Sequence, residues 1–253
     1  MTKPYDFIDT HCHLDFAVFD NHREQLLQRC AEVGIRNFIN PAVSFNNWQH
    51  VITLSLQYPQ ITPALGLHPC FIEEHHKHDT DALFTQLTKH DIKLIGEIGL
   101  DARMPDYNRQ KTLFIRQLDI AVELKKPVII HSVRAHNDTL MLLKSSGLKN
   151  GGIIHAFTGS YETACQYIKL GFTLGIGSIL SYPHSRLQTL IPRLPLDDMV
   201  LETDAPDMPL FQNNESVNTP LTLIETFRHL CTLRTEDADI IASQLYNNSL
   251  KFI

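Results

Sequence analysis

The sequence has few cysteines and none of the spacings that cysteine chemistry requires. Its five cysteines are scattered along the chain, with no C-x-x-C pair, at Cys12, Cys30, Cys70, Cys165 and Cys231. An odd and dispersed set argues against a disulfide framework and equally against a zinc site built from thiolates. We therefore expect small buried or neutral thiols in a reducing compartment.

Long apolar runs and leader segments are also missing. No stretch approaches the ~18 consecutive apolar residues that a membrane helix needs. The first residues, MTKPYDF, carry one lysine and no apolar run, unlike a secretory signal or a mitochondrial presequence. We expect a soluble, cytoplasmic protein that makes no contact with a membrane.

Positive charge is scarce as well. The chain has 22 lysines and arginines against 28 aspartates and glutamates, a formal net charge of −6. Proteins that bind long nucleic-acid duplexes through the phosphates usually carry excess Lys and Arg. The charge balance therefore argues against sequence-independent binding of a long duplex. An enzyme remains possible, because metal ions can supply positive charge locally. This balance favours a strand end or a short single strand over a long duplex.

Short β-rich segments alternate with longer helical segments along the whole chain. Eight candidate strands lie at residues 6–11, 36–43, 61–68, 93–100, 127–132, 151–157, 172–180 and 198–205. Helical periodicity fills the intervals at residues 22–34, 46–59, 81–90, 109–126, 137–147 and 160–171, with two further helices after residue 219. This alternation predicts an α/β fold, a single-domain (β/α)8 TIM barrel over residues 1–253, with a doubly wound open sheet as the competing fold.

Six potential metal ligands stand where predicted strands end. They are His11 and His13 on the first strand, Glu97 on the fourth, His131 on the fifth, His155 on the sixth and Asp204 on the eighth. The carboxyl ends of barrel strands form one rim, which is where barrel enzymes carry their active sites. Residues two apart on a strand face the same way, so His11 and His13 can reach one cation. The pattern predicts a metal site at this rim.

Four imidazoles and two carboxylates exceed the needs of one tetrahedral ion with an open position. Two divalent ions sharing a carboxylate is the economical arrangement, and Glu97, central in strand order, is the natural bridge. Mixed nitrogen and oxygen ligands suit Zn, Mn, Co or Ni, and Mg less well; the sequence does not identify the metal. We expect hydrolysis by a bridging metal-bound hydroxide, with Glu97 and Asp204 catalytic and Asp204 taking the proton.

Further polar residues are predicted to surround the ligands. Asp9, Asp101 and Glu202 share the strand parity of the ligands and are predicted to lie one layer behind them. His68 ends the third strand and Arg134 follows His131, so both are predicted substrate contacts.

Two more polar segments have simple structural interpretations. Ser160 is predicted to cap the helix that follows it, although that helix end could also receive a phosphate. The run EEHHKHDTD at residues 73–81 has three histidines and is most simply a solvated loop.

Six motifs appear in order from the first strand to the eighth: DTHCHLD, ALGLHP, IGEIGLD, PVIIHS, HAFTGS and ETDAPDMPL. Together they resemble the TatD family of metal-dependent deoxyribonucleases within the amidohydrolase-like barrels, and most closely its YjjV branch. The resemblance implies cleavage of DNA phosphodiesters, mainly exonucleolytic and aided by divalent ions. It also implies one ion on His11, His13, Glu97 and Asp204 and another on Glu97, His131 and His155.

The chain departs from the family pattern at two positions near the ligands. Val133 stands where many members have an arginine after the HS pair, which places phosphate contact through that loop in doubt. Ala156 stands where many have a cysteine, a change that should not affect metal binding.

Two other functions compete with a deoxyribonuclease. One is a metal-dependent hydrolase of a small amide, lactone or phosphoester, because similar metal rims support such reactions. The other is a scaffold in nucleic-acid maintenance that retains its ions but works by binding. The sequence predicts no particular protein partner.

Overall fold

Eight parallel strands form the centre of the computed structural model, which describes residues 5–212 and 217–253. They are β1 (Phe7–Asp9), β2 (Ile35–Pro41), β3 (Ile61–Leu65), β4 (Leu94–Asp101), β5 (Val128–Val133), β6 (Gly152–Ile154), β7 (Phe172–Ile176) and β8 (Met199–Leu201). Each strand pairs in parallel with the next, from β1 to β8. Thr10 links the two ends of the sheet by donating its backbone N–H to the Leu201 carbonyl at 3.0 Å. The predicted (β/α)8 barrel is confirmed.

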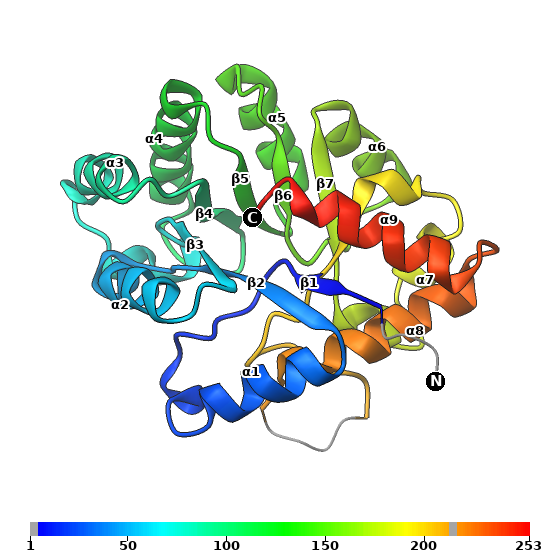
Figure 1. Ribbon diagram of the computed structural model, residues 1–253. Coiled ribbons are helices and arrows are strands. Elements are labelled where there is room, and N and C mark those ends of the chain that lie inside the picture. The colour runs from blue at the N-terminus through cyan, green and yellow to red at the C-terminus, as the bar shows by residue number, and fades with distance from the viewer. Residues whose placement is uncertain (1–4, 213–216) are drawn as a thin grey trace.

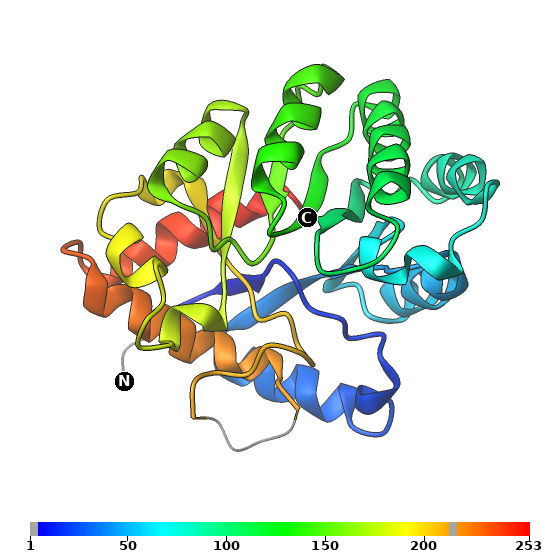
Figure 2. The same ribbon diagram turned by 180° about the vertical axis from the view of Figure 1, so that it is seen from behind.

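Helices surround this barrel (Figures 1 and 2). They are α1 (Arg23–Glu32), α2 (Phe45–Gln57), α3 (Asp79–Lys89), α4 (Tyr107–Leu124), α5 (His136–Ser146), α6 (Tyr161–Lys169), α7 (Leu187–Leu190), α8 (Leu223–Leu233) and α9 (Ala238–Leu250). Most strand residues are buried, and β4 is buried at all eight positions, because helices cover the strands outside and side chains fill the barrel inside. Within the described ranges, no helix is long and apolar enough to span a membrane.

One end of the barrel is filled by apolar side chains. Phe252 packs against residues from six strands: Ile39, Ala64, Leu94, Ile129, Ile153 and Val200. Figure 1 shows the chain returning along α9 so that the C-terminus lies near the centre of the ring. A hydrophobic plug of this kind leaves the opposite end, where the strands finish, for polar chemistry.

Several strands are shorter than predicted. β1, β6 and β8 each have only three residues, because the chain leaves the regular ladder just after them. The segments after β1 and β8 bind each other instead: Asp204 donates its N–H to the His11 carbonyl at 2.8 Å, and His13 to Ala205 at 2.7 Å. Asp204 has a positive φ of 58°, so this segment is not an extended strand.

Two further predicted strand ends are also wrong. β3 ends at Leu65, and β7 ends at Ile176 rather than residue 180. A short helical turn, η3 (Ser178–Ser181), and α7 follow β7; the sequence patterns did not predict either. Because α7 has only four residues, it is too short to give a periodic signal.

Candidate metal centre

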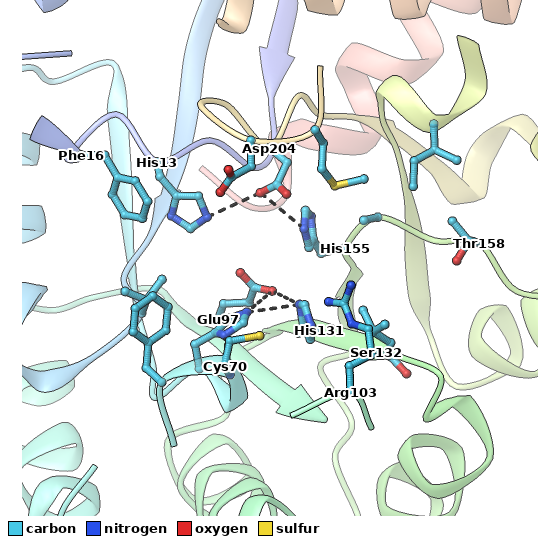
Figure 3. Close-up of a pocket in the computed structure, with 18 residues that line it drawn as sticks. His13, Phe16, Cys70, Glu97, Arg103, His131, Ser132, His155, Thr158 and Asp204 are labelled. Carbon is cyan, nitrogen blue, oxygen red and sulfur yellow. Dashed lines mark hydrogen bonds and ion pairs between the residues drawn. The ribbon is translucent and has the colours of Figure 1, made fainter. Parts of the chain in front are cut away.

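The six predicted ligands converge at the carboxyl end of the barrel, where Figure 3 shows several of them facing one another. Glu97, buried on β4, lies between two histidines. Its Oε2 is 3.1 Å from His11 Nε2, and its Oε1 is 2.7 Å from His131 Nδ1. The two oxygens of one carboxylate are thus directed at different imidazoles, which is the arrangement that a bridging ligand needs.

Asp204 lies opposite Glu97 and faces three histidines with one oxygen. Its Oδ1 is 3.5 Å from His11 Nε2, 3.5 Å from His13 Nε2 and 3.6 Å from His155 Nε2. These separations exceed an ordinary N–H···O hydrogen bond of roughly 2.7–3.2 Å. They match the spacing of about 3.4 Å between ligand atoms on a tetrahedral ion with bonds of about 2.0–2.1 Å.

His11 provides an independent test of whether the site suits a cation. Its ring is completely buried and stacks on that of His155, with centroids 3.5 Å apart. Among the described residues, neither ring nitrogen of His11 makes a hydrogen bond; Glu97 Oε2 approaches Nε2 to 3.1 Å but forms an ion-pair contact only. A buried polar atom without a partner is costly, and coordination of an ion would satisfy Nε2. The donor set therefore fits divalent metal.

Oxygen atoms behind the other histidines favour the tautomers that metal binding requires. His13 donates from Nδ1 to the Pro41 carbonyl at 3.1 Å, which leaves Nε2 free. Behind the other two rings stand carboxylates. His131 Nε2 lies 3.1 Å from Asp101 Oδ2, and His155 Nδ1 lies 3.1 Å from Glu202 Oε1. Carboxylates in this position orient ligand histidines and raise their basicity.

Glu202 is itself held in place by the backbone around it. Its Oε1 accepts the Ala156 N–H at 2.6 Å, and its carboxylate packs against Gly175 on β7. A Cβ atom on Gly175 would lie 2.2 Å from Glu202 Oε2, whereas one on Gly177 would approach no atom closer than 3.5 Å. Only glycine at position 175 therefore leaves room for this carboxylate.

We expect Gly175→Ala to displace Glu202 and so to release the His155 ring. Loss of such support typically weakens metal binding by about 10–100-fold. Competition with a fluorescent zinc chelator would measure the affinity, and Gly177→Ala is the matched control because its added methyl has space. Equal affinities for the two variants would mean that Glu202 does not support a metal ligand.

Burial and charge act in opposite directions on the groups of the cluster. Burial lowers the pKa of His11, with repulsion from His155 adding to the effect. Burial alone would raise the pKa of Glu97, but the surrounding histidines, His68 and His11 foremost, hold it well below its usual range. The pKa of Asp204 is likewise held low against burial, first by His155. Both carboxylates are therefore negatively charged, as coordination of a cation requires.

Asp9 has a different role from its neighbours. Its carboxylate accepts the backbone N–H of His11 at 3.2 Å and of Thr203 at 3.0 Å, and the Thr203 hydroxyl at 2.5 Å. It therefore joins the segments after β1 and β8 and contacts their backbones rather than a histidine ring. Burial raises the pKa of Asp9 to about 7, although the Thr203 hydrogen bonds oppose this shift.

His68, a predicted substrate contact, lies at the edge of the cluster. Its Nδ1 accepts the Cys70 N–H at 3.0 Å, so its proton resides on Nε2. That Nε2 lies 3.0 Å from Glu97 Oε1 and 3.2 Å from His131 Nδ1. His68 thus presents an N–H donor to the centre.

In the part of the chain that the structure describes, three groups of three side chains have ligand atoms within 4.8 Å of one another. They are His11, His13 and Asp204; His11, Glu97 and His155; and His68, Cys70 and His131. The first belongs to the ligand set expected for one ion. The second expected set, Glu97, His131 and His155, is not one of these groups, because His131 is grouped with His68 and Cys70. The division of ligands between two ions therefore stays a prediction.

A cavity of about 600 Å³ opens above these groups. Arg103, which the sequence reasoning missed, lines it and holds Asp101 through two nitrogens, with Nη2 2.6 Å from Oδ2. The sequence signal that could have identified Arg103 as a cavity residue is its position two residues after Asp101, where β4 ends. Arg134 does not line this cavity and instead lies in the neighbouring hollow.

Two interpretations of polar segments have different outcomes. The solvated-loop prediction for residues 73–81 is wrong at His75, which is 2% exposed and donates from Nε2 to the His68 carbonyl at 2.8 Å. The capping prediction is confirmed, because the Ser160 hydroxyl accepts the Thr163 N–H at the start of α6.

Comparisons with known proteins point to one family. A family model described as "TatD related DNase" matches residues 8–253. The chain is similar to YjjV of Escherichia coli K12, an "uncharacterized metal-dependent hydrolase", at 40% identity over 248 residues and 96% of each chain. An "uncharacterized metal-dependent hydrolase" of Haemophilus influenzae is 32% identical over 96% of this chain and 97% of its own length. The crystal structure of Escherichia coli YjjV has a TM-score of 0.94 at 39% identity, covering 98% of this chain and 97% of that one.

Proposed function

Because the chain belongs to the TatD family, we propose that it is a divalent-metal-dependent hydrolase of phosphodiester bonds, with the end of a DNA strand as its substrate. The single observation that carries the metal chemistry is Asp204 Oδ1, 3.5–3.6 Å from three histidine nitrogens. Carboxylate and imidazoles at this spacing suit one shared cation better than direct hydrogen bonds. The family model's description as DNases supports DNA as the substrate.

Six side chains of this cluster would hold two ions: His11, His13, Glu97, His131, His155 and Asp204. Glu97 is suited to the shared position because its two oxygens are directed toward His11 and His131. When bound, the ions would supply an acidified water as nucleophile and neutralise charge that develops on phosphoryl oxygens. Nitrogen and oxygen donors favour Zn, Mn, Co or Ni over Mg.

Asp204 is the proposed proton acceptor for the attacking water. Its pKa is held below the usual range, so the carboxylate is ionised before the reaction. One oxygen faces the histidines, and the second remains to receive a proton. The side chain is 16% exposed, which allows contact with water and substrate in the cavity. General base catalysis of this kind typically contributes about 10²–10⁴-fold.

His68 is the proposed donor to the substrate. Because its Nδ1 accepts the Cys70 N–H, the Nε2 proton is directed at the centre. In this structure the N–H faces Glu97 Oε1 at 3.0 Å. With that oxygen on an ion, the N–H would be left to hydrogen-bond a phosphoryl oxygen as its negative charge grows. His75 supports this geometry by donating to the backbone carbonyl of His68.

A small-molecule hydrolase is the second candidate, and the walls of the cavity are compatible with it. Phe16, Phe71, Val43 and Met208 line the space around the ligands, so much of its surface is apolar. Such walls suit a small amide, lactone or phosphoester as readily as a nucleotide. The shared metal rim does not distinguish the two functions.

Reloading metal-stripped protein separately with Mg, Mn, Co or Zn tests the proposal. We expect metal-dependent release of nucleotides from one end of end-labelled single-stranded DNA, and less from duplex. A parallel panel of bis-p-nitrophenyl phosphate, a lactone and an amide addresses the second candidate. Turnover of the lactone or amide, with DNA left intact by protein that has bound its ions, would contradict the deoxyribonuclease proposal.

A further inference from the structure

A second hollow opens beside the metal cavity, and Thr158 lines both. This groove of about 650 Å³ runs past the first residues of α5 and α6 and reaches Arg186, just before α7. Arg134, Asn137 and Thr163 also line it. The metal cavity and this groove therefore meet at Thr158, a polar residue that follows β6.

The groove carries positive charge that the nearby side chains leave uncompensated. Arg134 and Arg186 are exposed, and within the described residues neither side chain has an ion-pair partner. Asp138, the one acid among the described residues that line the groove, already binds Lys111 Nζ at 2.7 Å and the Tyr107 hydroxyl at 2.9 Å. In a chain with a formal net charge of −6, two free guanidinium groups beside a metal centre form a local site for anions.

The groove also offers uncharged donors for an extended anion. The first turns of α5 and α6 border it, and helix N-termini present free backbone N–H groups and positive dipole ends. Thr158 and Ser160, in the loop after β6, also line the groove and add hydroxyl groups to it. Arginines with hydroxyl and backbone donors are the usual contacts for a phosphate backbone.

We propose that this groove binds the sugar–phosphate backbone of a single DNA strand whose terminal phosphodiester lies in the metal cavity. The inference rests on the proposed function and adds a direction for the strand. Figure 3 shows Phe16 and Thr158 on opposite sides of the ligand cluster. The strand passes Thr158, so the terminal nucleoside lies on the side of Phe16. One face of the Phe16 ring stacks on His13, with centroids 4.9 Å apart, and the ring also lines the cavity, where a base can pack against it.

Binding of a fluorescently labelled twelve-nucleotide single strand in EDTA tests the groove without requiring hydrolysis. We expect the double variant Arg134→Glu/Arg186→Glu to bind at least tenfold more weakly than the natural protein. Each phosphate contact contributes about 0.7 to the salt slope for single strands, so the slope should fall by about 1.4. Arg116→Glu, which reverses one exposed charge on α4, is the control for charge reversal away from the groove and should retain both affinity and slope.

Steady-state kinetics provide a second readout. For the double variant, KM for the labelled strand should rise at least fivefold more than KM for bis-p-nitrophenyl phosphate, which is too small to reach the groove. Phe16→Ala should raise KM for a normal strand more than for one whose terminal nucleotide is abasic. Equal binding by the double variant and the Arg116→Glu control would overturn the proposed groove, even if the protein cleaves DNA. Strong groove-dependent binding without cleavage by metal-loaded protein would instead support the groove and contradict the deoxyribonuclease function.

Discussion

Replacing Glu97 with glutamine is expected to reduce metal-dependent hydrolysis by roughly a thousandfold or more, equivalent to about 4 kcal/mol of transition-state stabilisation. Glutamine keeps the size of the side chain but removes the charge that faces His11, His68 and His131. The centre then loses the more buried of its two proposed ligand carboxylates, which is 2% exposed against 16% for Asp204. Bound metal should fall by at least one ion per chain, measured by elemental analysis after dialysis against a metal-buffered solution.

The control for Glu97→Gln is Glu123→Gln, which removes an exposed carboxylate from α4 and should leave turnover and metal content as they are. Circular dichroism and the thermal midpoint exclude unfolding as the cause of lost activity. Glu97→Asp offers a second check, because it keeps the charge and shortens the reach. Full metal content with normal turnover in the Glu97→Gln variant would show that Glu97 is not a metal ligand.

The barrel was predictable because its signals are local. Each strand is a short apolar run and each helix a periodic one, and the alternation does not depend on distant contacts. The rim followed from a general property of parallel barrels, which gathers strand ends wherever they lie in the sequence. His11 and Asp204 are 193 residues apart, yet their ring and carboxylate approach to 3.5 Å.

Strand parity was a less reliable guide than strand position. Asp9, His11 and His13 were assigned to one face of one strand, but β1 ends at Asp9. The two histidines still reach the cluster, because the segments after β1 and β8 hydrogen-bond to each other in an irregular path. Asp9 faces the backbone of Thr203 instead of a ring. Parity holds only while the chain remains extended.

Contacts that depend on the path of an irregular segment were harder to predict. Arg103 binds Asp101 from two residues further along the chain, where its backbone N–H also donates to Asp101 Oδ1 at 2.9 Å. His75 is buried because the helical turn η2 (Pro69–Glu74) brings it under the His68 carbonyl. The spacing of Arg103 from Asp101 offered a signal for the first contact, but the burial of His75 has none, since it depends on the path of an irregular segment.

Replacing Asp204 with asparagine is expected to lower kcat by about 10²–10⁴-fold while the protein retains most of its metal. The amide keeps an oxygen that can face the nitrogens of His11, His13 and His155, so binding at this position weakens without being abolished. What is lost is the ability to accept a proton, because an amide oxygen is far less basic than a carboxylate. Metal content and kcat measured on the same preparation separate the two effects.

The position of Asp204 makes this separation informative. Its Oδ1 faces the three histidines, so a purely structural ligand would show turnover falling in proportion to metal content. A proton acceptor predicts a much larger fall in kcat than in occupancy, and partial rescue by added formate or acetate, which can replace the missing carboxylate. Asp197→Asn, an exposed substitution just before β8, should alter neither quantity. If metal content and kcat fall together and no carboxylate restores turnover, Asp204 holds an ion but the proton leaves by another route.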